Sequence, residues 1–414
     1  MKQRKRYALV GASGRGLGMY AYPLKEEYAD VAEVVGIFDP NPVRSAYVKE
    51  FCRLDCRTYT DYDRMIRETR PETVIVTTVD RYHHEYIIRA LEAGLDAITE
   101  KPMTVDLEKC RQILETEART GRKVIVTFNY RFTPYITRIR ELLRDGLVGT
   151  ILNVDFEWLL DTRHGADYFR RWHRRKENSG GLLVHKATHH FDAINWWVGE
   201  EPEVVNAFGS LRFYGPNRKK RGQRCLTCRH RSSCEFYFDL TANERMVKMY
   251  LEAEKHDGYH RDGCVFSEEI DIEDSMSVNV RYSGGALLTY SLVAHSPYEG
   301  FRASVSGTDG RIEVAEYQSG DSTGGTHQTV TFFNRRNERI TYQVPKATGG
   351  HGGGDTRLRR MLFRGDLPDP LNHMAGSYEG AISMLIGAAA NRSIARGRAI
   401  RIQDHVPLAD YRKR

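Results

Sequence analysis

The chain has 414 residues, of which 40% are hydrophobic and 28% are charged. Aliphatic residues, 16 Phe and 23 Tyr are spread along its length, which excludes a largely disordered protein, and no apolar run approaches the roughly 18 residues that a transmembrane helix needs. The formal net charge of +7 is scattered, so we expect a solvated basic surface and neither a nucleic-acid partner nor a membrane partner.

A basic hexapeptide, residues 1–6, opens the chain and is followed by the apolar residues 7–10. Four apolar residues are too few for the core of a signal peptide, and a glycine-rich turn follows them directly. We therefore expect a first strand at this point and a cytoplasmic protein.

Strand and helix patterns alternate over the first 125 residues. Apolar strands are expected at 7–10, 31–38, 74–77, 97–99 and 124–128, and amphipathic helices at 83–93 and 107–121. This alternation is typical of a parallel sheet with helices on both faces. It predicts an α/β domain over residues 1–127.

The pattern changes after about residue 150 to one strand after another. Strands are expected at 151–160, 204–214, 275–282, 286–294, 301–307, 311–316, 329–333 and 340–344, with hairpin turns at 283–285 and 308–310. This favours a second domain over residues 128–402, built on a large and mainly antiparallel sheet. The polar stretch 215–264 is expected to be an insertion, and 378–395 a final amphipathic helix.

A turn rich in small residues, Gly11-Ala12-Ser13-Gly14-Arg15-Gly16, follows the first strand. Small residues let the backbone approach a pyrophosphate, and the next helix N-terminus favours its negative charge. Asp39 closes the second strand, where an acid binds a ribose 2′-hydroxyl and repels a 2′-phosphate. NAD is therefore the predicted cofactor, although Arg44 leaves NADP as a less favoured alternative. An ordinary strand–turn–helix with an Asp cap is the alternative.

The tripeptide Glu100-Lys101-Pro102 ends a strand of the same sheet. Ligands bind outside the carboxyl ends of such strands. Glu100 and Lys101 point to opposite faces if the strand continues, and a lysine beside a cationic nicotinamide would have a low pKa or donate to a substrate hydroxyl. A surface lysine is the alternative.

Three histidines and a lysine lie within six residues after Gly180-Gly181. In one continuous helix, His185, His189 and Asp192 would share a face. They would form a proton-transfer set with His189 as the base, or bind a metal. Buried, hydrogen-bonded histidines are the alternative.

These segments, with residues 78–83 and Asn129-Tyr130-Arg131-Phe132, resemble the glucose–fructose oxidoreductase/inositol dehydrogenase/MocA family over residues 6–402. The resemblance implies an N-terminal Rossmann domain, a C-terminal α/β domain with an open sheet, and NAD(P)-dependent chemistry on sugars, polyols and their derivatives. It also implies a homodimer or homotetramer that pairs through the open sheet.

The resemblance assigns catalytic roles to Lys101 and His189. The family often has Asp where this chain has His185, which we also place in the catalytic set. The predicted cofactor-binding residues are Gly11, Ser13, Gly14, Arg15, Gly16, Asp39, Thr78, His83, Glu100 and Lys101. The predicted substrate-binding residues are Tyr130, Arg131, Trp172, His173, Lys186, Asp192 and His351.

The expected reaction oxidises a secondary alcohol. His189 would take the hydroxyl proton, Lys101 would stabilise the alkoxide, and hydride would pass to NAD⁺. One alternative is a glycoside hydrolase that oxidises its sugar transiently and eliminates the aglycone, chemistry that His185 and Lys186 would serve. Another is a non-catalytic sugar sensor, against which the presence of Lys101 and His189 argues.

Cysteines are concentrated in and beside the expected insertion, at Cys225, Cys228, Cys234 and Cys264. Four thiolates would bind zinc tetrahedrally and hold together a segment that lacks its own core. A structural zinc site is therefore one hypothesis, and free thiols or a redox pair are the other.

Overall fold

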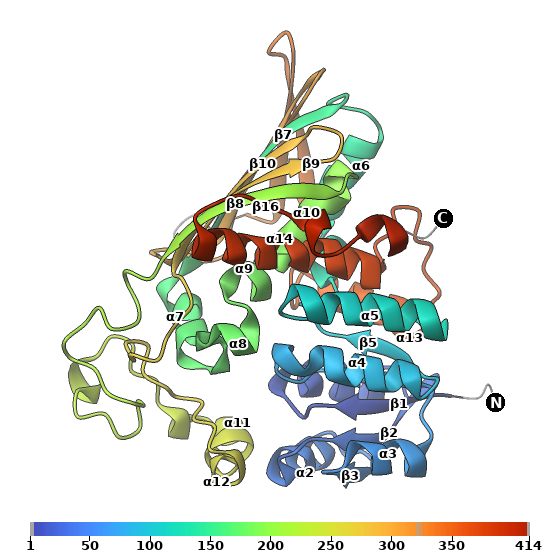
Figure 1. The fold of residues 1–414 in the computed structure, drawn as a ribbon, viewed down its shortest axis with the longest axis vertical. Helices are drawn as coiled ribbons and strands as arrows, with labels where there is room; N and C mark the ends of the chain where they lie inside the picture. Colours follow the sequence, from blue (N-terminus) through green and yellow to red (C-terminus); the bar gives the residue numbers. More distant parts are fainter. Residues whose placement is uncertain (1–3, 321–322, 324, 412–414) are drawn as a thin grey trace.

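A computed structural model describes residues 4–320, 323 and 325–411, so half of the basic opening hexapeptide lies outside the description. Within the described residues the chain forms one seven-stranded and one nine-stranded sheet (Figure 1). We call them the N-terminal sheet and the C-terminal sheet. Among the described helices, none combines the length and apolarity needed to cross a bilayer.

The N-terminal sheet has the order β15-β6-β5-β4-β1-β2-β3. Its strands are β1 (Lys5–Val10), β2 (Ala32–Phe38), β3 (Arg57–Tyr59), β4 (Thr73–Val76), β5 (Asp96–Thr99), β6 (Val124–Val126) and β15 (Ala375–Gly376). All neighbours pair in parallel except β15 with β6. This is the expected doubly wound α/β sheet.

Five helices connect these strands: α1 (Tyr22–Glu26), α2 (Pro42–Phe51), α3 (Tyr62–Thr69), α4 (His83–Glu92) and α5 (Leu107–Thr120). Side chains of Asn41, Asp61 and Asp106 accept backbone hydrogen bonds at the starts of α2, α3 and α5. All residues of β4 are buried, as a parallel strand covered on both faces requires. The short β3 lay outside the sequence prediction.

The C-terminal sheet has the order β14-β13-β12-β11-β7-β10-β9-β8-β16. Its strands are β7 (Ile151–Asp161), β8 (Pro202–Ser210), β9 (Ser275–Tyr282), β10 (Leu287–Ser296), β11 (Gly300–Gly307), β12 (Gly310–Tyr317), β13 (His327–Asn334), β14 (Arg339–Pro345) and β16 (Ile400–Arg401). Only β7 and β10 pair in parallel among the described neighbours, so the sheet is mainly antiparallel as expected.

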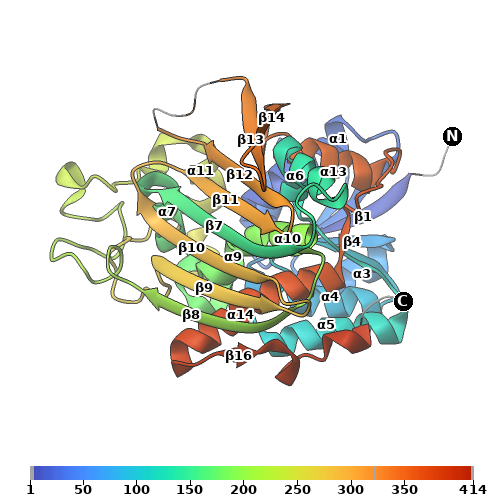
Figure 2. The same ribbon diagram turned by 90° about the horizontal axis from the view of Figure 1, so that it is seen from above.

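Burial alternates along the strands of this sheet, which shows that one face is covered and the other is open. Seen from above, the strands cross over α10 (Thr188–Val198) and α14 (Ser377–Arg396) (Figure 2). The buried α14 also packs on α5 and β6 of the N-terminal domain. Because β15 joins the N-terminal sheet from the far end of the chain, the two domains are closely connected.

The remaining helices lie between and beside the sheets: α6 (Pro134–Arg144), α7 (Thr162–Arg170), α8 (Lys176–Ser179), α9 (Leu182–His185) and α13 (Gly354–Phe363). The helix expected through His185, His189 and Asp192 is divided into α9 and α10. The condition for a shared face, one continuous helix, is therefore not met.

The insertion, residues 215–264, leaves the C-terminal sheet after β8 and carries α11 (Glu244–Met246) and α12 (Glu254–Asp257). Figure 1 shows α11 and α12 beside α2 of the N-terminal domain. The insertion is less polar inside than its composition predicted. Phe236, Leu240 and Met249 are buried, and the Arg218 guanidinium lies 5.3 Å from the ring centroid of Phe236.

Candidate active site

The glycine-rich turn packs tightly against the end of β4. Gly11 has φ +95°, and a Cβ atom there would lie 2.7 Å from the backbone nitrogen of Thr78. A Cβ atom on Gly16 would lie 2.5 Å from Oγ1 of Thr77. Ser13 Oγ accepts the Gly16 N–H at 3.0 Å, so this serine caps the turn. These contacts require small residues at Gly11 and Gly16, and the turn leads into the start of a helix, where an anion is favoured.

Asp39 lies beside this turn at the end of β2. Its Oδ2 accepts the Ala12 N–H at 2.8 Å, and its Oδ1 accepts the Asn41 N–H at 2.8 Å. The side chain is buried, and Arg44 Nη2 lies 3.5 Å from Oδ1. A tight glycine turn at a helix start and an anchored carboxylate after the second strand together fit a dinucleotide.

Arg15 and Glu100, both predicted to bind cofactor, bind each other. Arg15 Nε donates to Glu100 Oε1 at 2.8 Å, and its Nη1 lies 3.1 Å from Asp355 Oδ2 at the start of α13. Tyr20 donates to the same Glu100 oxygen at 2.8 Å. This network ties the glycine turn to the end of β5. Lys101, the next residue, contacts His185 of the C-terminal domain instead.

Thr78 and His83 also hold the loops around this edge. The ring nitrogens of His83 lie 2.8 Å from the carbonyl oxygen of Pro102 and 3.2 Å from that of Thr78. His83 is fully buried. Its contacts make it a residue that positions the Lys101 loop, and its predicted contact with cofactor stays a prediction.

Lys101, His185 and Asp80 form a chain of contacts across the two domains. Lys101 Nζ donates to the His185 carbonyl oxygen at 2.9 Å and lies 3.5 Å from His185 Nε2. His185 Nδ1 lies 2.5 Å from Oδ2 of Asp80. Burial lowers the pKa of Lys101 to about 8, although Asp80 and Glu100 favour its charged form. The lysine therefore gains and loses its proton in the pH range near neutrality in which enzymes work.

This contact also explains why α9 ends at His185. In a continuous helix the His185 carbonyl would accept the His189 N–H. It accepts the Lys101 ammonium instead, and the His189 N–H turns to the Lys186 carbonyl at 3.3 Å. The tertiary bond thus replaces a helical one.

Asp80 was missed by the sequence analysis. It lies four residues beyond β4, at the start of the short 3-10 turn Asp80–Tyr82 that follows the carboxyl end of this buried strand, and its side chain is only 4% exposed. A buried acid at this edge of a parallel sheet is a signal that could have found it. It supplies the carboxylate that this chain lacks at position 185.

His189 lies close to Lys101 and His185 but makes different contacts. Its ring centroid is 5.5 Å from that of His351 and 6.1 Å from that of Tyr130. Its Nδ1 has no hydrogen-bond partner among the described residues. Burial, and then Lys101, lower its pKa well below the ordinary value. His189 is thus a neutral imidazole with a nitrogen left for a ligand.

The structure gathers most of the other predicted substrate residues around these histidines. Trp172 stacks on His173 with ring centroids 3.6 Å apart, and His173 lies 4.3 Å from His185. The Lys186 ammonium lies 4.5 Å from the Trp158 ring, and His351 Nδ1 is 2.9 Å from Asn129 Nδ2. Asn129 and Tyr168, whose ring lies 5.5 Å from His185, were not predicted.

Two predicted substrate residues are placed elsewhere. Arg131 Nη2 lies 2.6 Å from Asp192 Oδ1 and Nε donates to Oδ2 at 2.7 Å, with side chains 3% and 0% exposed. Arg131 and Asp192 thus form a buried ion pair, and their predicted contact with substrate stays a prediction.

The zinc hypothesis for Cys225, Cys228, Cys234 and Cys264 is not supported. Among the described residues, no three His, Cys, Asp or Glu side chains are arranged to hold a metal. Arg170 Nη1 lies 3.2 Å from the Cys225 sulfur, and burial raises the pKa of that thiol, which disfavours the thiolate that zinc needs. The described cysteines are free thiols.

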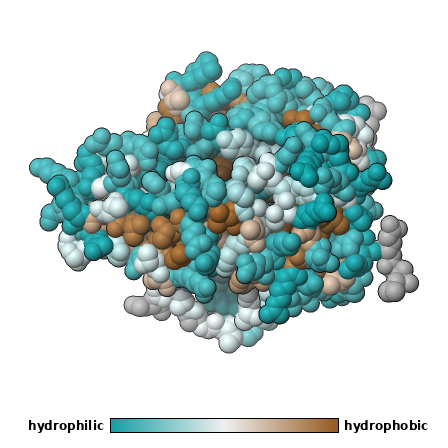
Figure 3. All heavy atoms as spheres, turned by 90° about the horizontal axis from the view of Figure 1, so that it is seen from below, coloured by the Kyte–Doolittle hydropathy of each residue, from teal (hydrophilic) through white to brown (hydrophobic). Residues whose placement is uncertain are grey.

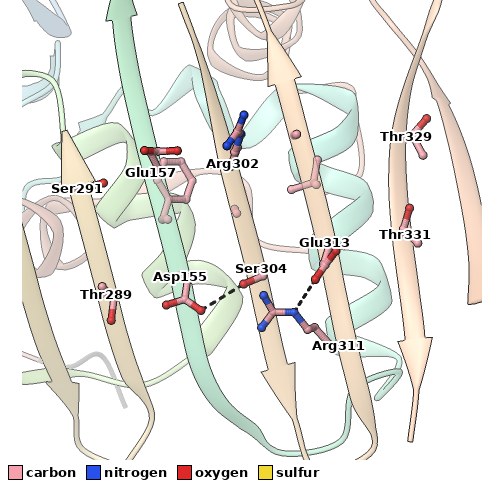
Figure 4. Close-up of a pocket in the computed structure, with 14 residues that line it drawn as sticks. Asp155, Glu157, Thr289, Ser291, Arg302, Ser304, Arg311, Glu313, Thr329 and Thr331 are labelled. Atoms are coloured by element: carbon pink, nitrogen blue, oxygen red, sulfur yellow. Dashed lines mark hydrogen bonds and ion pairs between the residues drawn. The ribbon is translucent and has the colours of Figure 1, made fainter. Parts of the chain in front are cut away.

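A separate hollow of about 580 Å³ lies on the open face of the C-terminal sheet (Figure 4). Hydroxyl and charged side chains line it, with Ser304 3.3 Å from Asp155 and Arg311 2.8 Å from Glu313. None of the predicted site residues is among them, so we do not assign catalysis to this hollow.

Comparisons with known proteins agree with this geometry. Residues 5–128 match the model of an oxidoreductase family, NAD-binding Rossmann fold, and residues 140–402 match that of its C-terminal alpha/beta domain. The chain is 39% identical to YteT of Bacillus subtilis (strain 168), over 97% of this chain and 98% of YteT.

More distant relatives align over about half of the chain. Inositol 2-dehydrogenase/D-chiro-inositol 3-dehydrogenase of Lactiplantibacillus plantarum is 24% identical over 52% of this chain and 57% of its own length. 2,7-anhydro-N-acetylneuraminate hydratase of Mediterraneibacter gnavus is 28% identical over 49% and 52%. The fold is similar to the WlbA dehydrogenase from Bordetella pertussis, crystallised with NADH and UDP-GlcNAcA, with TM-score 0.66, 17% identity and coverage of 96% and 99%.

Proposed function

Because the chain belongs to the Gfo/Idh/MocA family of oxidoreductases, we propose that it transfers a hydride between a secondary hydroxyl of a sugar, polyol or glycoside and NAD. The observation that carries the proposal is the contact chain Asp80–His185–Lys101 beside the unpartnered His189. These groups meet where ligands bind parallel sheets.

The cofactor would be held by the turn at Gly11, Gly14 and Gly16, with Asp39 on the ribose. The turn offers backbone N–H groups at a helix start, and Asp39 is a buried acceptor. Bound NAD⁺ would supply the hydride acceptor. The rest of the chemistry is proton transfer and charge stabilisation by side chains of this chain.

In the proposed oxidation, His189 accepts the proton of the substrate hydroxyl. A neutral imidazole is ready for this role, because its lowered pKa leaves it unprotonated at pH 7. The charged Lys101 donates a hydrogen bond to the oxygen as negative charge develops on it. His185 and Asp80 act through Lys101 as positioning residues, since they contact the lysine and each other.

A specific observation also favours a second function. One relative is a 2,7-anhydro-N-acetylneuraminate hydratase. Its name supports, for this chain, chemistry in which a group leaves the sugar carbon and water is added. The alternative is therefore an NAD-dependent glycoside hydrolase that oxidises the sugar transiently, with His185 or Lys186 in the elimination. A non-catalytic sugar sensor is disfavoured by Lys101, which is held against His185 and has a lowered pKa.

The test is mass spectrometry of sugars, polyols and glycosides after incubation with the protein and NAD⁺. A product lighter by two hydrogens, with equal NADH, is the expected result. Cleavage of a glycoside without net NADH would establish the alternative. No turnover across the panel, with NADH still bound by the protein, would overturn both in favour of the sensor. Lys101→Met should abolish either reaction in a protein that keeps its cooperative thermal transition.

The protein is also proposed to form a homodimer or homotetramer through the open face of the C-terminal sheet. This face carries polar, paired side chains suited to a wet interface, as around Ser304 and Arg311 (Figure 4). Light scattering after size exclusion should give a multiple of 47.6 kDa. A monomer would contradict the proposal.

A further inference from the structure

The insertion contacts the N-terminal domain at the segment that follows Asp39. Asn41 Nδ2 donates to the carbonyl oxygen of Ala253 at 2.8 Å and to Asp257 Oδ2 at 3.1 Å. The guanidinium of Arg44 forms an ion pair with the same oxygen of Asp257. A residue near the end of the insertion thus binds both side chains beside the expected ribose site.

Arg44 is the residue that would otherwise bind NADP. An arginine close to the acid after the second strand is the group that accommodates a 2′-phosphate. Arg44 Nη2 lies 3.5 Å from Asp39 Oδ1, and its side chain is 16% exposed. A phosphate would have to draw this guanidinium away from two carboxylates, one on each side.

The partners of Asp257 show that it is fixed in this place. Its Oδ1 accepts the N–H of Tyr259 at 3.1 Å, and its Oδ2 faces Asn41 and Arg44. Asp39 and Asp257 each carry one negative charge, and Arg44 carries one positive charge. These three side chains together therefore have a net charge of about −1 at neutral pH. That charge repels a 2′-phosphate and leaves a 2′-hydroxyl unaffected.

We propose that Asp257 is a cofactor-specificity residue, which selects NAD over NADP by occupying Arg44 and adding a second negative charge beside Asp39. The inference rests on the proposed use of a nicotinamide dinucleotide. It assigns part of the cofactor selection to the insertion of the C-terminal domain, more than 200 residues beyond the ribose acid in the sequence.

A second contact shows that the insertion continues over the glycine turn. The Tyr250 hydroxyl lies 3.5 Å from the place of a Cβ atom on Gly14, and its ring lies 5.8 Å from the Arg261 guanidinium. Seen from below, the molecule is hydrophilic over most of its surface, with hydrophobic residues gathered along the middle of the face (Figure 3). The contact at Asp257 is polar, because its partners are the Asn41 amide and the Arg44 guanidinium, so a charge substitution there tests it directly.

The test uses Asp257→Asn in the full chain and measures the Kd of NADH and NADPH by nucleotide fluorescence, without substrate. We expect NADPH affinity to rise by about tenfold or more, because one like charge is lost and Arg44 is freed. NADH affinity should stay within about threefold. Glu252→Gln is the matched control, because this exposed acid of the insertion pairs with Lys248 and not with Arg44.

Arg44→Gln in the Asp257→Asn background should remove the gain, since the gain acts through the guanidinium. The proposal is overturned if NADPH affinity does not rise, if Glu252→Gln raises it equally, or if both nucleotides weaken together. Should Asp257→Asn lose its cooperative thermal transition, Asp257→Ser replaces it. Because no substrate is present, failure to oxidise sugars counts only against the proposed function.

Discussion

The Nδ1 atom of His185 lies 2.5 Å from Oδ2 of Asp80, so a carboxylate from the N-terminal domain holds an imidazole from the C-terminal domain. A neutral His185 would donate from Nδ1 to Asp80 and present the lone pair of Nε2 to Lys101, 3.5 Å away. Asp80 thereby decides the tautomer and, through it, the surroundings of the lysine.

Asp80→Asn tests this arrangement. An amide can donate to Nδ1, which would place the ring proton on Nε2 against Lys101. We expect kcat to fall about 100-fold with NADH affinity unchanged. The apparent pKa of Lys101 should also fall, since Asp80 favours its charged form. Asp63→Asn, which removes an exposed acid bound to Arg89, is the control. An unchanged pH profile would show that Asp80 is only structural.

The pH dependence of oxidation follows from Lys101 and His189. The rate should rise as His189 loses its proton below pH 6.5 and fall as Lys101 loses its proton near pH 8, because the base must be neutral and the lysine charged. Measurement of kcat from pH 5 to pH 10 at saturating NAD⁺ checks this. A rate that keeps rising through pH 9 would instead make neutral Lys101 the base.

Gly11→Ala should impair cofactor binding. A Cβ atom at φ +95° costs about 1–2 kcal/mol, and it would also meet the Thr78 backbone at 2.7 Å. We expect NADH affinity to fall at least about tenfold. Gly18→Ala is the control, because a Cβ atom there meets nothing within 4 Å. Equal effects of both substitutions on the NADH titration would count against the placement of the turn.

The ion pair of Arg131 and Asp192 should contribute to stability rather than to turnover. Arg131→Met leaves an unpaired buried carboxylate and should lower the free energy of unfolding by about 3–5 kcal/mol. The double variant with Asp192→Leu should recover most of the loss. Urea unfolding measures both. If the single variant unfolds like the parent but has a raised KM, the pair belongs to the substrate site after all.

The architecture could be predicted from the sequence because it depends on local patterns. Buried runs such as β4 and the alternation along β9 and β10 determine both sheets. The catalytic geometry could not, because it depends on contacts between distant segments. His185 and Asp80 are 105 residues apart, and the break between α9 and α10 arises from a bond with Lys101. Helical periodicity alone therefore could not show that Asp192 pairs with Arg131.

The insertion shows the same limit. Its cysteines left a zinc site as one hypothesis beside free thiols, whereas Arg170 lies against Cys225 and Arg218 against aromatic rings. Each arginine contacts a group from a different segment of the chain. Such contacts depend on the tertiary fold and cannot be predicted from composition. The pairing of Arg44 with Asp257, 213 positions away, is another instance.

The docking of α12 beside α2 has a consequence for the design of chimeras that use only the N-terminal domain. A nucleotide-binding domain is ordinarily expected to keep its cofactor preference when it is transferred to another protein. Here, however, α12 of the other domain contacts the residues beside the ribose site. If residues 1–128 were joined to the substrate domain of another protein, the chimera would keep Arg44 but lose its ion pair with Asp257. We therefore expect the chimera to bind NADP.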